Sequence, residues 1–226
     1  MSVIRVGVAA VDEFNNNISQ TSVSDTESFL ENVWKYEIED GTGNYSANFT
    51  GRYYDTVPVK PLCDDCDNYW ERARNADDWL RNNWNDYSNY YASKDVIVVL
   101  DYHDNKEDHI GVAQSTAGTP TKKVVLVNAK EVKGDPVRSP DEIKKVAAHE
   151  LFHMFIDEDP GYPDYSSEHY PHVTSTPRGD FLSTVMYDLG EIEYDCTFSG
   201  ASADQVASNT SSCTRNRVRD FIDSNL

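Results

Sequence analysis

Long apolar runs and basic residues are both scarce in this sequence. No stretch approaches the roughly 18 uninterrupted apolar residues of a membrane helix, so we expect no membrane span. The chain has 39 acidic and 20 basic residues, a net charge of −19. Such a chain repels phosphate, and we therefore expect no nucleic-acid partner. An acidic surface fits a protein kept soluble in a salty or extracellular medium. An ordinary acidic protein fits the same charge equally well.

Cysteine is scarce as well. The N-terminal stretch and the four cysteines are the two features that bear on whether the protein is secreted. The N-terminal stretch MSVIRVGVAAV has one arginine and no apolar region ending in a cleavage site, so we expect a first strand rather than a signal peptide. The four cysteines favour two disulfides over a structural zinc site. Three pairings are open, and the most local one joins Cys63 to Cys66 and Cys196 to Cys213.

Hydrophobic patterning predicts an α/β (α+β) domain with a mixed sheet. Apolar runs predict strands at 4–11, 95–100 and 123–128, with a short edge strand at 111–114. Residues 24–40 allow a helix, 41–61 have loop or hairpin character, and the aromatic spacing over 67–91 predicts one long helix with Trp70 on its buried stripe. A terminal helix is expected over 214–226, with three apolar residues inward: Val218, Phe221 and Ile222.

The most specific chemical signal is His149-Glu-Leu-Phe-His153, on a helix that starts at Ser139-Pro140. Histidines four residues apart lie on the same face of a helix, so both imidazoles can bind one Zn²⁺ ion. Glu150 would lie beside the metal, where a carboxylate can take a proton from water and pass it to a leaving amine. The alternative is a pair of helix histidines held by ordinary hydrogen bonds.

A second motif, Ser183-Thr-Val-Met186-Tyr187, places Met186 33 residues after His153. With the helix motif, it resembles the methionine turn of the metzincins, zinc endopeptidases in which a methionine forms an apolar floor under the metal ligands. The strand order before the active-site helix is similar to the metzincin upper subdomain. The resemblance implies a mixed, mostly parallel sheet packed on two long helices, followed by a small irregular C-terminal subdomain ending in a helix.

This resemblance predicts one peptidase domain over residues 1–226. The upper subdomain would span 1–157 and include the active-site helix 140–157. The lower subdomain would span 158–226 and include the methionine turn and the terminal helix.

The sequence departs from the metzincin pattern after the second histidine. Metzincins place a glycine three residues later and the third ligand three residues after that, where this chain has Ile156 and Asp159. A β-branched residue is poorly suited to the left-handed conformation that the glycine adopts. We therefore expect the helix to continue past Ile156 and to stop near Pro160.

The third zinc ligand is thus a choice among several residues. We expect His169, delivered by an inserted loop, with Asp159 and His172 as alternatives, because three imidazoles or two imidazoles and a carboxylate both make catalytic zinc shells. Glu168 in this role would make a gluzincin-like peptidase, but residues 165–173 show no convincing helix. The acidic stretch 157–164 is interpreted as solvated, and calcium binding there stays open.

Together these features predict a secreted-type, monomeric zinc endopeptidase that acts on peptides or proteins. A zinc-bound water, activated by Glu150, would attack the peptide carbonyl. The strand at 111–114 would bind the substrate backbone as a sheet edge. The alternative from another class is a non-catalytic binding module that uses zinc for stability.

Overall fold

The main sheet has five strands in the order β2-β1-β3-β5-β4. The computed structural model describes residues 3–18, 21–52, 56–58, 62, 69–83, 87–103, 111–113, 123–130, 140–155, 173–175, 181–183, 205–206 and 212–225. Four strands are parallel: β1 (Ile4–Ala10), β2 (Ala47–Gly51), β3 (Val96–Asp101) and β5 (Val124–Asn128). The edge strand β4 (Gly111–Ala113) pairs antiparallel with β5. This mixed, mostly parallel sheet confirms the predicted fold class.

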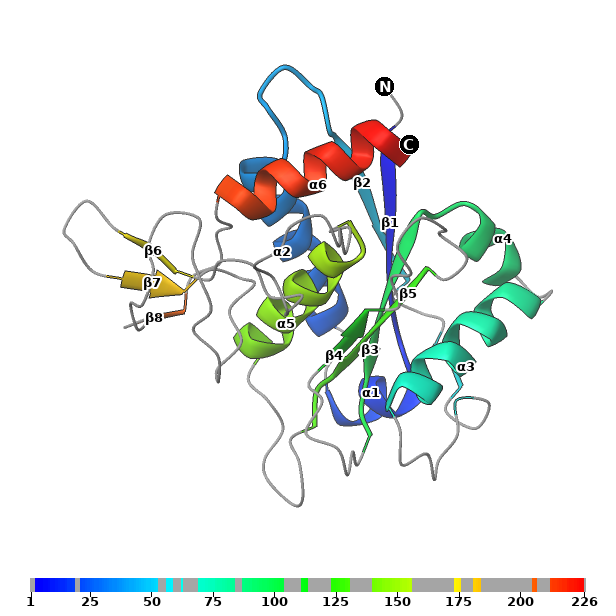
Figure 1. Cartoon of the computed structure of the whole chain (residues 1–226). Helices are drawn as coiled ribbons and strands as arrows, with labels where there is room; N and C mark the ends of the chain where they lie inside the picture. Colours follow the sequence, from blue (N-terminus) through cyan, green and yellow to red (C-terminus); the bar gives the residue numbers. More distant parts are fainter. Residues whose placement is uncertain are drawn as a thin grey trace.

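Helices cover both faces of the sheet, with α2 and α5 on one side and α3 and α4 on the other (Figure 1). Every residue of β3 and of β5 is buried as a result. Strands buried on both faces need apolar residues at consecutive positions, which is why these runs lack the alternation of a half-exposed strand. The strands predicted at 4–11, 95–100, 111–114 and 123–128 are all present.

The helix α2 (Thr21–Glu37) connects β1 to β2. Because the chain crosses over through this helix, β2 returns parallel to β1, with Ile4 opposite Ala47. Of the loop or hairpin considered for 41–61, the described residues contain one strand, β2, which pairs parallel with β1 rather than in a hairpin. The helix α5 (Pro140–His153) packs beside α2 on the same face of the sheet.

The long helix predicted over 67–91 is two helices, α3 (Tyr69–Asn82) and α4 (Tyr87–Ala92). The predicted stripe is also displaced at its start, because Trp70 is 41% exposed whereas Tyr69 is buried. The reason is polar: the Tyr69 hydroxyl donates a hydrogen bond to Asp101 at the end of β3, 3.3 Å away. A stripe predicted from apolar character alone does not predict a hydrogen bond such as that of Tyr69 to Asp101.

The remaining elements are a short helix, a small sheet and a terminal helix. The helix α1 (Asp12–Asn17) follows β1, and the strands β6 (Val173–Ser175), β7 (Phe181–Ser183) and β8 (Gln205–Val206) form a separate three-stranded sheet. The terminal helix α6 (Ser212–Asn225) buries Val218 and Ile222 and half-buries Phe221, which confirms its prediction. Within the described part of the chain, no helix is long and apolar enough to cross a membrane.

Candidate metal centre

The helix α5 starts at Pro140, a residue whose fixed φ suits the first helical position. Its inward face carries apolar residues that pack on the sheet and on α2, including Ile143, Ala147, Leu151 and Phe152. The Phe152 ring stacks on Trp34 of α2 at a centroid distance of 6.0 Å. This packing fixes the rotation of the helix about its axis, and with it the directions of His149, Glu150 and His153.

The two histidines of the motif come together as the helical spacing predicts. The Nε2 atoms of His149 and His153 are 3.0 Å apart, and the ring centroids are 4.7 Å apart. Two nitrogens bound to one zinc ion at tetrahedral angles lie about 3.3 Å apart, which is close to this separation. His153 is buried and His149 is half-buried. The donor atoms and their spacing therefore fit half of a zinc shell.

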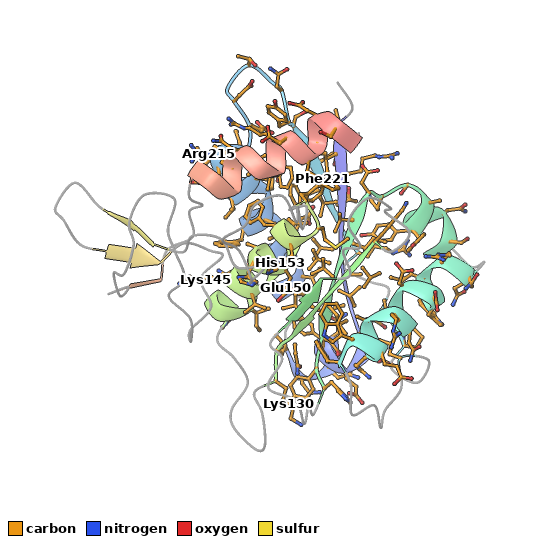
Figure 2. All side chains as sticks on the ribbon, viewed as in Figure 1. Lys130, Lys145, Glu150, His153, Arg215 and Phe221 are labelled. Carbon is orange, nitrogen blue, oxygen red and sulfur yellow. The ribbon has the colours of Figure 1, made fainter. Side chains whose placement is uncertain are left out.

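Glu150 points toward the edge strand of the sheet. Its side chain lies against Gly111 of β4, so close that a Cβ placed on Gly111 would be 2.5 Å from Glu150 Cγ and 2.8 Å from Glu150 Oε1. The Glu150 residue is only 9% exposed. In Figure 2, Glu150 and His153 lie close together on α5. The carboxylate is thus held between the histidine-bearing helix and the sheet edge.

A buried polar cluster lies at the end of β3. The Arg72 guanidinium donates two hydrogen bonds to the Asp101 carboxylate, from Nε to Oδ2 at 2.6 Å and from Nη2 to Oδ1 at 2.8 Å. Burial raises the pKa of the Tyr69 phenol well above its ordinary value, and the Asp101 charge adds to this effect. The Glu150 charge acts on Tyr69 in the same direction. Tyr69 therefore stays a neutral hydrogen-bond donor within electrostatic reach of Glu150.

The segments that leave β3 and β5 are tied to each other at the same end of the sheet. Asn128 accepts a hydrogen bond from the His103 backbone N–H at 3.1 Å and donates one to the His103 carbonyl at 2.9 Å. The Lys130 N–H also bonds to Asn128 Oδ1. Sequence patterning did not single out Asn128 or the Arg72–Asp101 pair, because the Asn128–His103 and Arg72–Asp101 contacts join residues 25 and 29 positions apart.

The helix ends earlier than predicted, at His153 rather than beyond Ile156. The N–H groups of Met154 and Phe155 bond to the carbonyls of Leu151 and Phe152, at 3.2 and 2.9 Å. These bonds span three residues instead of four, which tightens the last turn and ends the α-helix. The chain therefore leaves the helix directly after the second histidine.

The terminal helix secures this end of α5. The ring of Phe221 meets Phe155 edge to face at a centroid distance of 6.0 Å. Arg219 Nε donates to the Ile38 carbonyl just after α2, at 2.7 Å, and Arg215 pairs with Glu37 at 3.0 Å. Figure 2 labels Phe221 and Arg215 on α6, which crosses the region of α2 and α5. These contacts hold α2, α5 and α6 together next to the histidines.

The other predicted site residues lie outside the part of the chain that the structure describes. These are the ligand candidates His169, Asp159, His172 and Glu168, together with Met186 of the methionine turn. Among the described residues, no group of three His, Cys, Asp or Glu side chains could hold a metal ion. Three of the cysteines, Cys63, Cys66 and Cys196, are also outside the described residues, and Cys213 belongs to α6. The third ligand and the disulfides remain predictions.

Comparison with known proteins adds no family assignment. No protein-family model matches the chain, and no curated protein matches it. The chain is similar in structure to a protein solved as a chaperone–substrate complex, with 9% sequence identity and a TM-score of 0.46 over 78% of this chain. The chain spans 26% of that protein. A likeness this distant carries no argument about fold or function.

Proposed function

We propose that this chain is a zinc-dependent endopeptidase of metzincin-like organisation. The observation that carries the proposal is the arrangement on α5, where two imidazole nitrogens 3.0 Å apart lie beside a buried carboxylate at a sheet edge. His149 and His153 would hold the metal. The third ligand would be His169, with Asp159 or His172 in its place as alternatives.

Glu150 is the residue proposed to move protons. Its carboxylate accepts a proton from the water that attacks the peptide carbonyl, and the proton then passes to the amine nitrogen as the carbon–nitrogen bond breaks. Zinc, when bound, supplies a Lewis acid that polarises the carbonyl and increases the acidity of water. The burial of Glu150 keeps bulk water from competing for the carboxylate.

The substrate is proposed to be a peptide or protein that lies along β4. This strand is at the edge of the sheet, and its pairing with β5 uses one of its two sides. An extended peptide can pair with a free strand edge through main-chain hydrogen bonds. Such pairing would bring a peptide bond beside Glu150, because Gly111 of the same strand contacts that side chain.

The setting proposed for this activity is extracellular and saline, with the chain acting as a monomer. The support is compositional: the net charge of −19 keeps copies of the chain apart and favours solubility at high salt. The two proposed disulfides suit the same oxidising environment.

The experiment that tests the function is hydrolysis of a peptide library by metal-free and zinc-restored protein. We expect no cleavage by the metal-free protein and recovered cleavage after zinc is returned, with Glu150→Gln as the matched inactive control. A protein that binds zinc but cleaves no peptide would support the zinc-stabilised binding module instead. Cleavage that persists without metal would reject the zinc mechanism.

A further inference from the structure

Gly111 and Glu150 are in closer contact than any side chain at position 111 would permit. Gly111 lies on β4 opposite Val127 of β5, and the Glu150 side chain fills the space where its Cβ would be. The distances from that Cβ position are 2.5 Å to Cγ, 2.8 Å to Oε1 and 2.9 Å to Cδ of Glu150. Carbon atoms in favourable contact are about 3.5–4.0 Å apart, so these positions cannot be occupied together.

The overlap involves the Cγ atom of Glu150 as well as its carboxylate. Relieving a contact at Cγ requires rotation about the first side-chain bond or a shift of β4 away from α5. Glu150 is buried, so the alternative positions of its side chain are restricted by the sheet and the helix. Either adjustment moves the carboxylate relative to His149 and His153 or relative to the sheet edge.

We infer that Gly111 is a positioning residue, whose lack of a side chain sets the place of the Glu150 carboxylate between the metal-binding helix and the edge strand. This inference deepens the proposed function and rests on it. Gly111 contacts no reacting atom in this role. It acts through Glu150, which must lie within hydrogen-bond reach of the attacking water.

The packing part of the inference is tested without activity, by a double-mutant cycle on thermal unfolding of the metal-free protein. Glu150→Ala removes the three atoms nearest to a Cβ at position 111. We expect Gly111→Ala to lower the Tm in the Glu150 background and to lower it much less in the Glu150→Ala background. Equal Tm losses in both backgrounds would overturn the inference.

Gly7 provides a matched control on the opposite face of the sheet. A Cβ at Gly7 would overlap the Tyr90 ring, with 2.8 Å to Cζ, so Gly7→Ala introduces a similar clash away from α5. We expect the Tm changes of Gly7→Ala and Glu150→Ala to add, because α4 and α5 cover opposite faces of the sheet. If Gly111→Ala alone fails to fold, recovered folding in Gly111→Ala/Glu150→Ala supports the inference, and failure of that double variant overturns it.

The catalytic part is tested by steady-state kinetics of the zinc-loaded proteins at matched zinc content. We expect Gly111→Ala to lower kcat by about 10- to 100-fold, the cost of misplacing a catalytic group by about an ångström, with KM changed by less than about threefold. Gly7→Ala should keep kcat within about twofold of the wild type. An unchanged kcat in Gly111→Ala, or a change confined to KM, would overturn the inference.

The two proposals fail in different ways. A zinc-loaded wild type that cleaves no peptide rejects the proposed function, whatever the cycle shows. An active wild type, an inactive Glu150→Gln and a fully active Gly111→Ala together reject the role of Gly111 and leave the proposed function in place.

Discussion

The ion pair between Arg72 and Asp101 is the most deeply buried charge interaction near the candidate site. Both side chains are fully buried and share two short hydrogen bonds. Burial disfavours the charged form of Arg72, but the hydrogen bond and charge of Asp101 outweigh it, and the net effect raises the pKa of the guanidinium. The pair anchors α3 to the end of β3, and Tyr69 joins it there.

Removing one partner of this pair should cost much stability. We expect Asp101→Asn to lower the free energy of unfolding by about 3–5 kcal/mol, because it removes the carboxylate charge that offsets the burial of the Arg72 guanidinium. Chemical denaturation of both proteins measures the difference. The control is Asp95→Asn at the Arg5–Asp95 pair, where Arg5 is half exposed, and its loss should be clearly smaller. Similar losses at the two pairs would contradict this account.

Single residues also show the limits of prediction from sequence at the site. The approach of His149 and His153 follows from helical periodicity, which the sequence displays directly. The contact of Glu150 with Gly111 depends on the register of β4 with β5 and on how α5 packs across them. The residues near Gly111 predict neither this register nor this packing. The sequence therefore predicts the edge strand but not its contact with Glu150.

Among the elements, the predictable ones carry strong local signals. The strands β3 and β5 are unbroken apolar runs, and both were predicted. The strand β2 was missed because its sequence, Ala-Asn-Phe-Thr-Gly, buries only Phe49 and resembles a loop. Its place in the sheet is set by pairing with β1 rather than by its own apolar pattern.

The end of α5 matters most for the third ligand. The prediction of a helix continuing past Ile156 relied on the poor fit of isoleucine to a left-handed conformation. The structure ends the helix before that position, through the tight bonds of Met154 and Phe155. Asp159 therefore stays a candidate for the third ligand, together with His169, and both must be tested.

Zinc content of four variants identifies that ligand. We expect His169→Ala to weaken zinc binding by more than about 100-fold, because loss of a ligand should exceed the effect of losing a residue that only supports one. Asp159→Ala and His172→Ala should each retain one zinc per chain. His109→Ala serves as a control for the loss of a histidine outside the candidate set. Loss of zinc in Asp159→Ala, with zinc retained in His169→Ala, would contradict the choice of His169.

For the whole molecule, the dominant property is its charge. A net charge of −19 on 226 residues makes the compact state repel itself, and added salt screens this repulsion. We expect the Tm to rise by about 2–4 °C between about 0.01 M and about 1 M NaCl, or about 1 kcal/mol in stability. Thermal unfolding followed by circular dichroism at fixed pH measures it. A Tm that falls with NaCl would contradict the proposed saline setting.

The most direct test of the central claim compares the wild type and Glu150→Gln for zinc content and peptide hydrolysis in the same samples. Glutamine has the shape of glutamate and can fit beside Gly111, but it cannot accept the proton from water. We predict one zinc per chain in both proteins and a loss of hydrolysis of at least about 100-fold in the variant. Hydrolysis at the wild-type rate by zinc-loaded Glu150→Gln would contradict the account.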